Sequence, residues 1–458
     1  MARIKRTLAK KPKHTIIPTE DQPYTIPDNW YWITFNTCKA GEDGFFDGDW
    51  ILSENMDQNG EVRLLQLSDI GIGVFLDKSD KHVSKKTFEQ LNCTQLYKGD
   101  VMISRMAEPI ARSCIVPSFP YTVITAVDVA VLRCDNRIID NRYVNYLCNT
   151  KWFTELAFNL ARGTTRVRIT RTNLGEMPVP LPPLPEQQRI VDRIERLFAK
   201  LDEAKEKAQA VVDGFEDRKA AILHKAFTGE LTEEWRKKQT TRVVEWKQAT
   251  FDDIIVSIKN GTTAKQNKET NNYPVTRIES LQRGTIDFSR LGYIVDPTTI
   301  SEEDYYREND IALSHINSAA HVGKTALIRA SFLPLVHGMN LLRIRLNSLC
   351  IPEFFVWYSR SVEYKEQITQ RINMAVNQVS INQKQLRTMP IPIPQIREQE
   401  IIVKILNENI YKLEQVKDTA EQVISQIDTM KKAILARAFR GELGTNDPSE
   451  PPADISIS

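Results

Sequence analysis

A long internal repeat constrains this chain more than any other feature of its sequence. The segment 177–231 matches the segment 389–443 without a gap at an offset of 212 residues, and about 22 of the 55 aligned positions are identical. Self-similarity at a fixed offset indicates one structural unit used twice. The 458-residue chain is therefore a tandem duplication, in which each copy is a large block followed by the shared segment.

Each copy of the shared segment opens with an extended lead-in. Prolines at alternate positions remove backbone donors and disfavour a helix. We expect a helix to follow, because an acidic residue (Glu186, Glu398) favours the positive end of a helix dipole and Pro185 suits the first helical position. Gly229 and Gly441 are suited to stopping these helices. The alternate prolines are Pro178, Pro180 and Pro182 in the first copy, and Pro390, Pro392 and Pro394 in the second.

The apolar residues of both shared segments follow a heptad spacing. Alternating steps of four and three residues are typical of a coiled-coil seam. The alternative is a long amphipathic helix packed on a globular core, which predicts a broader stripe with a 3.6-residue period. Each helix of roughly 42 residues is expected to be about 60 Å long. The expected seam residues are Ile190, Ile194, Leu197, Leu201, Val211, Phe215, Arg218 and Ile222, with Ile402, Leu406, Asn409, Leu413, Val423, Ile427 and Ile434.

The order of the segments predicts how these helices pair. The first helix ends where the second block begins, and the second helix begins where that block ends, so a compact block favours an antiparallel pair. With symmetric layers, the polar seam residues Arg218 and Asn409 fall in adjacent layers near the helix-weakening Gly214. We hypothesise that the two polar residues fix register and direction. An Arg218→Leu, Asn409→Leu double variant with unchanged helix orientation would contradict this.

The blocks before the helices are expected to share one fold. Both are rich in short apolar runs bounded by Gly, Asn and Asp, which favours strands. The segment 96–104 resembles 306–314, and 131–133 resembles 341–343. The remaining residues diverge far more than those of the helices. The helices are thus expected to be a shared framework, and the blocks to carry the variable information.

A loop just before each proline lead-in carries different polar side chains in the two copies. Residues 161–169 align with 373–381. Arginine can grip guanine O6 and N7 with two bonds, and Asn or Gln can do the same to adenine N6 and N7. Two modules that read different base pairs need such a substitution, although solvated polarity with some phosphate contact is an equally weighted alternative for any single residue. The candidates are Arg162, Thr164, Thr165, Arg166 and Arg168, and Asn377, Gln378 and Ser380.

Other polar clusters in the second block are weaker candidates for nucleic-acid contact. A turn is the more common reading of Gly261-Thr-Thr, and the two histidines His315 and His321 form no assignable triad or metal motif. These further candidates are Lys259, Thr262, Thr263, Lys265, Arg277, His315, Asn317 and Ser318.

Composition and missing motifs exclude several classes of protein. No apolar run approaches the roughly 20 residues that a membrane span needs, and the basic arm 1–23 has no signal-peptide pattern. The six cysteines form no C-x-x-C pair, so reduced thiols and a cytoplasmic location are expected. A phosphate-binding G-x-x-x-x-G-K-[ST] loop is absent. The net charge of +2 averages over segments of different charge. The segment 151–171, for example, holds five basic residues and one acidic residue.

The lead-ins and helix ends carry a family resemblance. The paired Pro-x-Pro-x-Pro…Glu-Gln motifs, the helices ending Ala-Ile-Leu-x-x-Ala-Phe-x-Gly-Glu-Leu, and the opening Ile26-Pro-Asp-Asn-Trp-Tyr-Trp-Ile33 resemble the specificity subunit of type I restriction-modification enzymes. The resemblance covers about 24–443, with Arg397 departing from Pro185 of the first copy. The chain itself lacks the Asn/Asp-Pro-Pro-Tyr/Phe motif of adenine methyltransferases.

This resemblance implies a fold class and a domain order. The expected class is α+β: two mixed α/β target-recognition domains separated by two long helices in an antiparallel coiled coil, with pseudo-two-fold symmetry. The expected parts are a basic and flexible arm 1–23, a first recognition domain 24–176, a hinge and helix 177–231, a second recognition domain 232–388, a hinge and helix 389–443, and a flexible tail 444–458.

The resemblance also implies a function in phage defence and DNA methylation. Each domain would read one half of a bipartite, asymmetric double-stranded DNA target, while the helices space the halves and dock two methyltransferase subunits. Motor-nuclease subunits complete the assembly, and S-adenosylmethionine, ATP and Mg²⁺ belong to the partners, so this cytoplasmic bacterial or archaeal chain is expected to be non-catalytic. The alternatives are a coiled-coil adaptor that binds proteins, and an enzyme with an unrecognised site.

Overall fold

The computed structural model describes residues 16–106, 108–164, 166–238, 246–282, 284–375, 378–453 and 455. The chain divides into two compact units. Unit 1 comprises residues 1–207 and 423–458, and unit 2 comprises residues 208–422. Among the described helices, none is both long enough and apolar enough to cross a membrane.

Unit 1 is built on two small sheets. A four-stranded antiparallel sheet has the order β2-β8-β5-β6, and a three-stranded sheet has the order β4-β3-β7, in which β3 and β7 are parallel. Every residue of β5 and β8 is buried, so these central strands form the core between the layers. The bounds are β2 (Phe45–Asp47), β3 (Val62–Leu65), β4 (His82–Val83), β5 (Val101–Ser104), β6 (Ser113–Ile115), β7 (Val123–Thr125) and β8 (Val129–Leu132).

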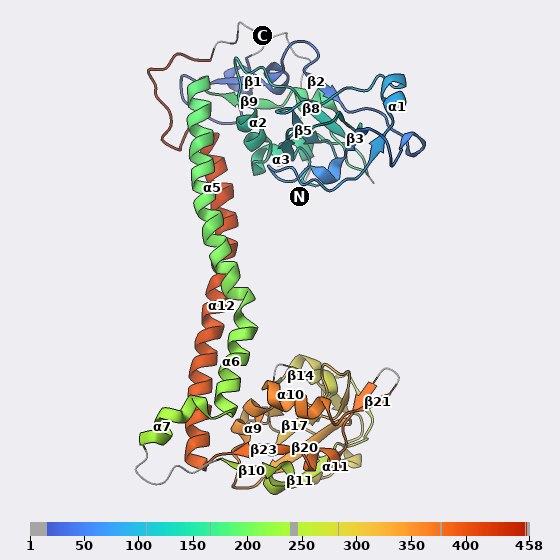
Figure 1. Ribbon diagram of the computed structural model, residues 1–458, viewed down its shortest axis with the longest axis vertical. Helices are drawn as coiled ribbons and strands as arrows, with labels where there is room; N and C mark the ends of the chain where they lie inside the picture. Colours follow the sequence, from blue (N-terminus) through green and yellow to red (C-terminus); the bar gives the residue numbers. More distant parts are fainter. Residues whose placement is uncertain are drawn as a thin grey trace. The chain divides into compact units, whose positions relative to one another are not determined.

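Short helices in unit 1 begin at side-chain caps. The Asp140 carboxylate accepts backbone N–H bonds at the start of α2, and the hydroxyls of Thr150 and Thr170 do the same for α3 and α4, which satisfies donors that the first turn leaves free. In Figure 1, α2 and α3 lie near β5 on the side of unit 1 that faces α5 (Leu184–Asp213), whereas α1 lies on the opposite side. The bounds are α1 (Lys85–Gln90), α2 (Asn141–Cys148), α3 (Lys151–Leu160) and α4 (Arg171–Gly175).

Unit 2 has the same arrangement of a four-stranded sheet followed by three short helices, which we call the frame. Its four-stranded antiparallel sheet has the order β11-β20-β17-β19, which matches β2-β8-β5-β6 strand for strand. Three helices follow the sheet as they do in unit 1. The bounds are α8 (Phe251–Ile254), β11 (Ile255–Asn260), β12 (Gln266–Asn267), β13 (Pro274–Val275), β14 (Leu281–Gln282), β15 (Thr285–Ile286), β16 (Gly292–Ile294), β17 (Ile311–Ser314), β19 (Thr325–Leu327), β20 (Leu341–Leu346), α9 (Pro352–Tyr358), α10 (Val362–Thr369) and α11 (Gln383–Arg387).

Strand register corrects one sequence match between the units. Val131 lies opposite Met102, whereas Arg343 lies opposite Ala312. Arg133 therefore corresponds to Arg345, two residues beyond the position that the local sequence similarity suggested. The ion pairs agree, because Arg133 binds Asp100 and Arg345 binds Asp310, with both aspartates one residue before the paired strand. The match of 131–133 to 341–343 is therefore shifted by two residues from the structural equivalence.

The alternate prolines form short edge strands. In unit 1, β9 (Pro178–Leu181) pairs antiparallel with β1 (Tyr31–Thr34), and in unit 2, β23 (Pro390–Ile393) pairs with β10 (Lys247–Thr250). A proline cannot donate to a ladder and is confined to one edge of a strand. Alternate spacing places all the missing donors on the unpaired edge, so the residues between the prolines remain free to bond.

The shared segments continue as long helices. The first copy forms α5 (Leu184–Asp213) and α6 (Phe215–Phe227), divided at Gly214, and the second forms α12 (Ile396–Ala438) without a break. Within unit 1, α5 and α12 run antiparallel side by side (Figure 1), and the ion pairs Lys205–Asp428 and Asp202–Lys431 mark their register. Within unit 2, Lys417 lies over the Phe215 ring at 5.2 Å.

This register corrects the symmetric layers expected from the sequence. Leu201 and Met430 line one groove in unit 1, whereas symmetric layers paired Leu201 with Val423. Arg218 is exposed and its guanidinium donates back across the break at Gly214 to the carbonyl of Val211 in α5, so it is not a seam residue. Asn409 is half-buried. The polar pair therefore does not sit in adjacent core layers, because the helices are displaced by about one heptad from the symmetric arrangement.

Candidate nucleic-acid interface

The loop before the first proline lead-in is a tight hairpin. Arg162 and Arg168 exchange two backbone hydrogen bonds of 2.9 Å. Gly163 turns the chain with a φ of +119°, and a Cβ there would lie 2.3 Å from the carbonyl oxygen of Arg166, so only glycine fits. Arg162, Thr164 and Arg166 are exposed on this hairpin. Thr165 lies outside the described residues.

Arg168 and Arg105 fix the stem of this hairpin. Arg168 donates a hydrogen bond of 2.7 Å to the carbonyl of Val127 and lies 3.5 Å from the Asp128 carboxylate. Arg105 donates to the carbonyl of Ile169 at 3.1 Å. Because its guanidinium is engaged within the unit, Arg168 positions the hairpin. Arg162 and Arg166 are the arginines left on the exposed side.

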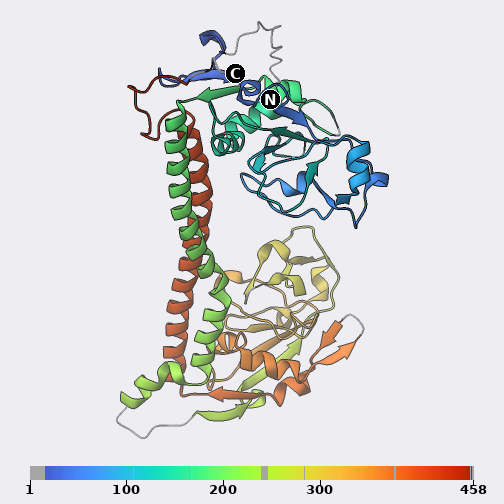
Figure 2. The same cartoon turned by 45° about the horizontal axis from the view of Figure 1, so that its top comes forward.

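Unit 2 has a hairpin at the equivalent place. Strands β21 (Asn373–Ala375) and β22 (Gln378–Ser380) pair antiparallel, and β18 (Ile316–Asn317) adds a third strand beside β22. The hairpin projects from the rest of unit 2 in both views (Figure 1 and Figure 2). Asn377 lies outside the described residues, and the structure describes only the backbone of Gln378. Ser380 is half-buried.

The third strand brings a second set of predicted residues to the hairpin. Asn317 pairs with Val379, and the carbonyl of His315 accepts a hydrogen bond of 2.9 Å from Ile381. Ser318 follows, exposed. Burial lowers the pKa of His315, and its Nδ1 has no hydrogen-bond partner among the described residues. Two clusters that are far apart in the sequence are therefore one polar surface.

The turn after β11 approaches the same region. The Thr262 amide donates to the carbonyl of His337 at 2.9 Å, and a Cβ at Gly261 would lie 1.9 Å from the carbonyl oxygen of Gly338. Gly261 thus permits a close backbone approach as well as a turn. The backbone of Asn340, two residues further along, hydrogen-bonds to His315. Thr262 is half-buried.

The remaining basic candidates differ in availability. Lys259 is paired with Glu303, and Arg277 lies 3.3 Å from Glu279. Such exposed pairs are weak and can be replaced by a phosphate at little cost. Thr263 and Lys265 are exposed. Sequence reasoning missed Arg105, because a buried arginine after a strand carries no motif.

The side chains described on this surface do not form a metal centre. Among the described residues, no group of three or more His, Cys, Asp or Glu side chains could hold a metal ion. All six cysteines are buried and unpaired. The exposed features are hydrogen-bond donors and acceptors on two equivalent hairpins, which suits recognition of base edges and phosphates.

Comparison with known families defines the class of this protein. The model for the type I restriction modification DNA specificity domain matches twice, at residues 45–212 and 243–424. These matches cover most of the chain and coincide with the two equivalent frames. The chain therefore belongs to the type I restriction-modification DNA specificity family, with two copies of the domain.

Named relatives agree with this class. The protein assigned as the specificity subunit of the MjaX type I restriction enzyme of Methanocaldococcus jannaschii is 37% identical over 213 residues, which are 45% of this chain and 48% of that protein. The match thus spans about half of that relative. The specificity subunit of the EcoKI type I restriction enzyme of Escherichia coli is 23% identical over 328 residues, 71% of this chain and 70% of that protein.

Solved structures agree with the fold. The HsdS subunit from Thermoanaerobacter tengcongensis has a TM-score of 0.64 at 19% identity, covering 93% of this chain and all of that one. A chain from a study of complex assembly and conformational transition in a type I restriction-modification system has a TM-score of 0.65 at 19% identity, covering 92% of this chain and all of that one. The expected α+β class with two domains and paired long helices is confirmed.

Proposed function

We propose that this chain is the DNA sequence-specificity subunit of a type I restriction-modification complex, in which each unit reads one half of a bipartite, asymmetric target. The observation that carries the proposal is the pair of equivalent hairpins. One hairpin exposes Arg162 and Arg166, whereas the sequence of the other hairpin carries Asn377, Gln378 and Ser380. Equal frames with unequal polar side chains suit the reading of two different half-sites.

The long helices supply a docking surface for methyltransferase subunits. An apolar groove of about 290 Å³ runs along the helix pair in unit 1, lined by Leu197, Leu201, Met430, Ala433 and Ile434. Met430 is 49% exposed although it is apolar. An exposed apolar groove with charged rims is typical of protein interfaces.

The chemistry of the complex is assigned to its partners. We expect two methyltransferase subunits and motor-nuclease subunits to bring S-adenosylmethionine, ATP and Mg²⁺, while this chain contributes no catalytic residue. Reading two half-sites with linked domains multiplies specificity through effective concentration. The assembly is expected to work on cytoplasmic DNA.

Selection from a degenerate DNA library tests the proposal. The full chain is mixed with its methyltransferase subunits, bound duplexes are enriched, and the products are sequenced. A bipartite motif with a fixed spacer is expected. If no bipartite motif is enriched while the complex assembles, the chain is better described as a coiled-coil adaptor. Methylated adenines mapped in the host genome should fall within the same motif.

A further inference from the structure

Each long helix of a shared segment begins beside a buried glutamate that accepts an indole N–H. Trp30 Nε1 donates to Glu186 Oε2 at 2.8 Å, and Trp246 Nε1 donates to Glu398 Oε1 at 3.1 Å. Glu186 is fully buried and Glu398 is 3% exposed. A buried carboxylate needs several donors. The two junctions find their remaining donors in different segments of the chain.

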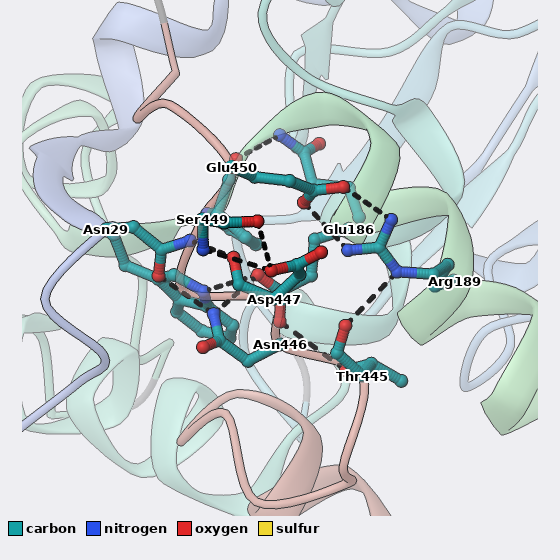
Figure 3. Close-up of polar contacts among 11 residues, drawn as sticks. Asn29, Glu186, Arg189, Thr445, Asn446, Asp447, Ser449 and Glu450 are labelled. Atoms are coloured by element: carbon teal, nitrogen blue, oxygen red, sulfur yellow. Dashed lines mark hydrogen bonds and ion pairs between the residues drawn. The ribbon is translucent and has the colours of Figure 1, made fainter.

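In unit 1 the donors come from the C-terminal segment. Asn446 Nδ2 donates to Glu186 Oε2 at 2.9 Å and to Asn29 Oδ1 at 2.8 Å (Figure 3). Asn29 Nδ2 returns a bond of 3.0 Å to the carbonyl of Asp447. The tail 444–458, expected from the sequence to be flexible, is thus held to unit 1 at residues 445–450, which we call the tail clasp.

An arginine on the helix fixes the tail clasp. Arg189 binds both carboxylate oxygens of Glu450, at 2.8 and 2.7 Å, and its Nε donates to the carbonyl of Thr445 at 3.1 Å (Figure 3). These bonds lower the pKa of Glu450. Ala453 and Ile455 then pack against the core of unit 1. Two parallel bonds give an Arg–carboxylate pair geometric specificity as well as energy.

In unit 2 the arginine comes from the connecting segment. After Gly229 the chain forms a 3-10 turn (Glu230–Thr232) and α7 (Glu233–Lys238). Thr232 Oγ1 donates to Glu398 at 2.6 Å, and the Arg236 guanidinium pairs with the same carboxylate while lying over the Trp246 ring. We call residues 229–238 the linker clasp.

The polarity of the two clasps is opposite. At the offset of 212 residues, Arg189 on the first helix is replaced by Ile401 on the second, and Glu450 of the tail clasp is replaced by Lys238 of the linker clasp. Both helices offer a glutamate, but the helix of unit 1 adds the cation Arg189, which receives the acid Glu450. In unit 2 the glutamate itself, Glu398, receives the cation Arg236.

We infer that docking of the tail clasp on α5 depends on the Arg189–Glu450 pair, and that docking of the linker clasp on α12 depends independently on the Arg236–Glu398 pair. The tail clasp follows the end of α12 in unit 1, and the linker clasp follows the end of α6 in unit 2, so chain connectivity brings each clasp to its helix start. The charge-assisted ion pair then holds the clasp there.

Hydrogen exchange of the full chain with mass-spectrometric readout tests the inference. Glu450→Arg and Arg189→Glu are each expected to speed exchange of the amides in 444–453 at least about tenfold, because a charge-assisted bidentate bond becomes a like-charge contact. The double reversal Arg189→Glu, Glu450→Arg is expected to restore protection to within about threefold of the wild type. The matched control Arg236→Glu is expected to release 229–238 and leave 444–453 unchanged.

Three results would overturn the inference. They are an unchanged tail in both single reversals, a double reversal that exchanges as fast as the single ones, and a tail released by Arg236→Glu. Protection of β5 and β8 in the same spectra reports whether unit 1 remains folded. Because the experiment uses no DNA and no partner subunit, its outcome is independent of the proposed function.

Discussion

The two units share one frame but fill it with different chemistry. At one equivalent position of the central strands, unit 1 has the buried apolar Val131 and unit 2 has Arg343, which is 1% exposed. Arg343 donates to the carbonyl of Tyr305 at 2.8 Å and lies 3.9 Å from Asp310. The comparison shows that strand order and caps define the frame, while buried side chains and hairpins are free to diverge.

The largest expected difference concerns the aspartate beside this position. Asp310 faces two arginines, Arg345 and the fully buried Arg343, whereas among the described residues Asp100 pairs with one arginine, the part-exposed Arg133. Asp310→Ala is expected to destabilise unit 2 by about 3–5 kcal/mol, because it strands a buried charge. Asp100→Ala should cost unit 1 about 1–3 kcal/mol, because Arg133 can rehydrate. Exchange of β17 and β5 amides measures the two effects, and equal losses would contradict the comparison.

Substitutions in the two hairpins are expected to affect the two half-sites independently. Arg166→Ala is expected to relax base preference in one half-site by about 1–3 kcal/mol, roughly 5- to 150-fold, and to leave the other half-site unchanged. Gln378→Ala should affect the other half-site alone. Library selection with the assembled complex reads both effects. Uniform weakening across all sequences would instead indicate phosphate contacts, and the exposed Lys151 provides a matched charge-removal control.

Lowering the pH is expected to destabilise unit 2, although by less than the Asp310 substitution does. Burial and, to a smaller extent, the charge of the neighbouring Arg343 lower the pKa of His337 in unit 2 from 6.5 to about 3. Between these values the unfolded chain binds a proton that the folded unit does not, so stability falls as pH falls. A loss of about 1 kcal/mol is expected for unit 2 between pH 6.5 and 5.5.

His337→Gln tests this pH dependence. The variant keeps a donor for the Leu341 carbonyl, which His337 Nε2 contacts at 3.1 Å, but it cannot titrate. The slope of unit 2 stability against pH should therefore flatten, as measured by urea unfolding monitored through exchange of β20. A slope identical to that of the wild type would assign the acid sensitivity to another group.

The smallest effect is expected on the helix pair. Arg218 is exposed, so Arg218→Ala should change stability by less than about 0.5 kcal/mol. Helix orientation, read from a spin label pair across α5 and α12 in unit 1, should be unchanged. A loss above 2 kcal/mol in thermal unfolding would restore the idea that Arg218 fixes the register.

Local patterns predicted the repeated elements well. Alternate prolines, the glutamates at 186 and 398 and the terminal glycines follow from backbone chemistry that acts over a few residues, and the structure confirms extended lead-ins followed by long helices. The loops 161–169 and 373–381 were also marked correctly as equivalent, since both form hairpins. Which of their side chains contact bases stays a prediction.

The sequence by itself determined the duplication, the helices and the family, because repeats, proline spacing and heptads are properties of neighbouring residues. Only the tertiary structure decided the helix register, the structural engagement of Arg168, the union of His315 and Asn317 with the second hairpin, and the docking of the tail at Arg189. Each of these depends on atoms brought together from distant parts of the chain. Such contacts are set by packing and by the need to satisfy buried polar groups, which no local pattern encodes.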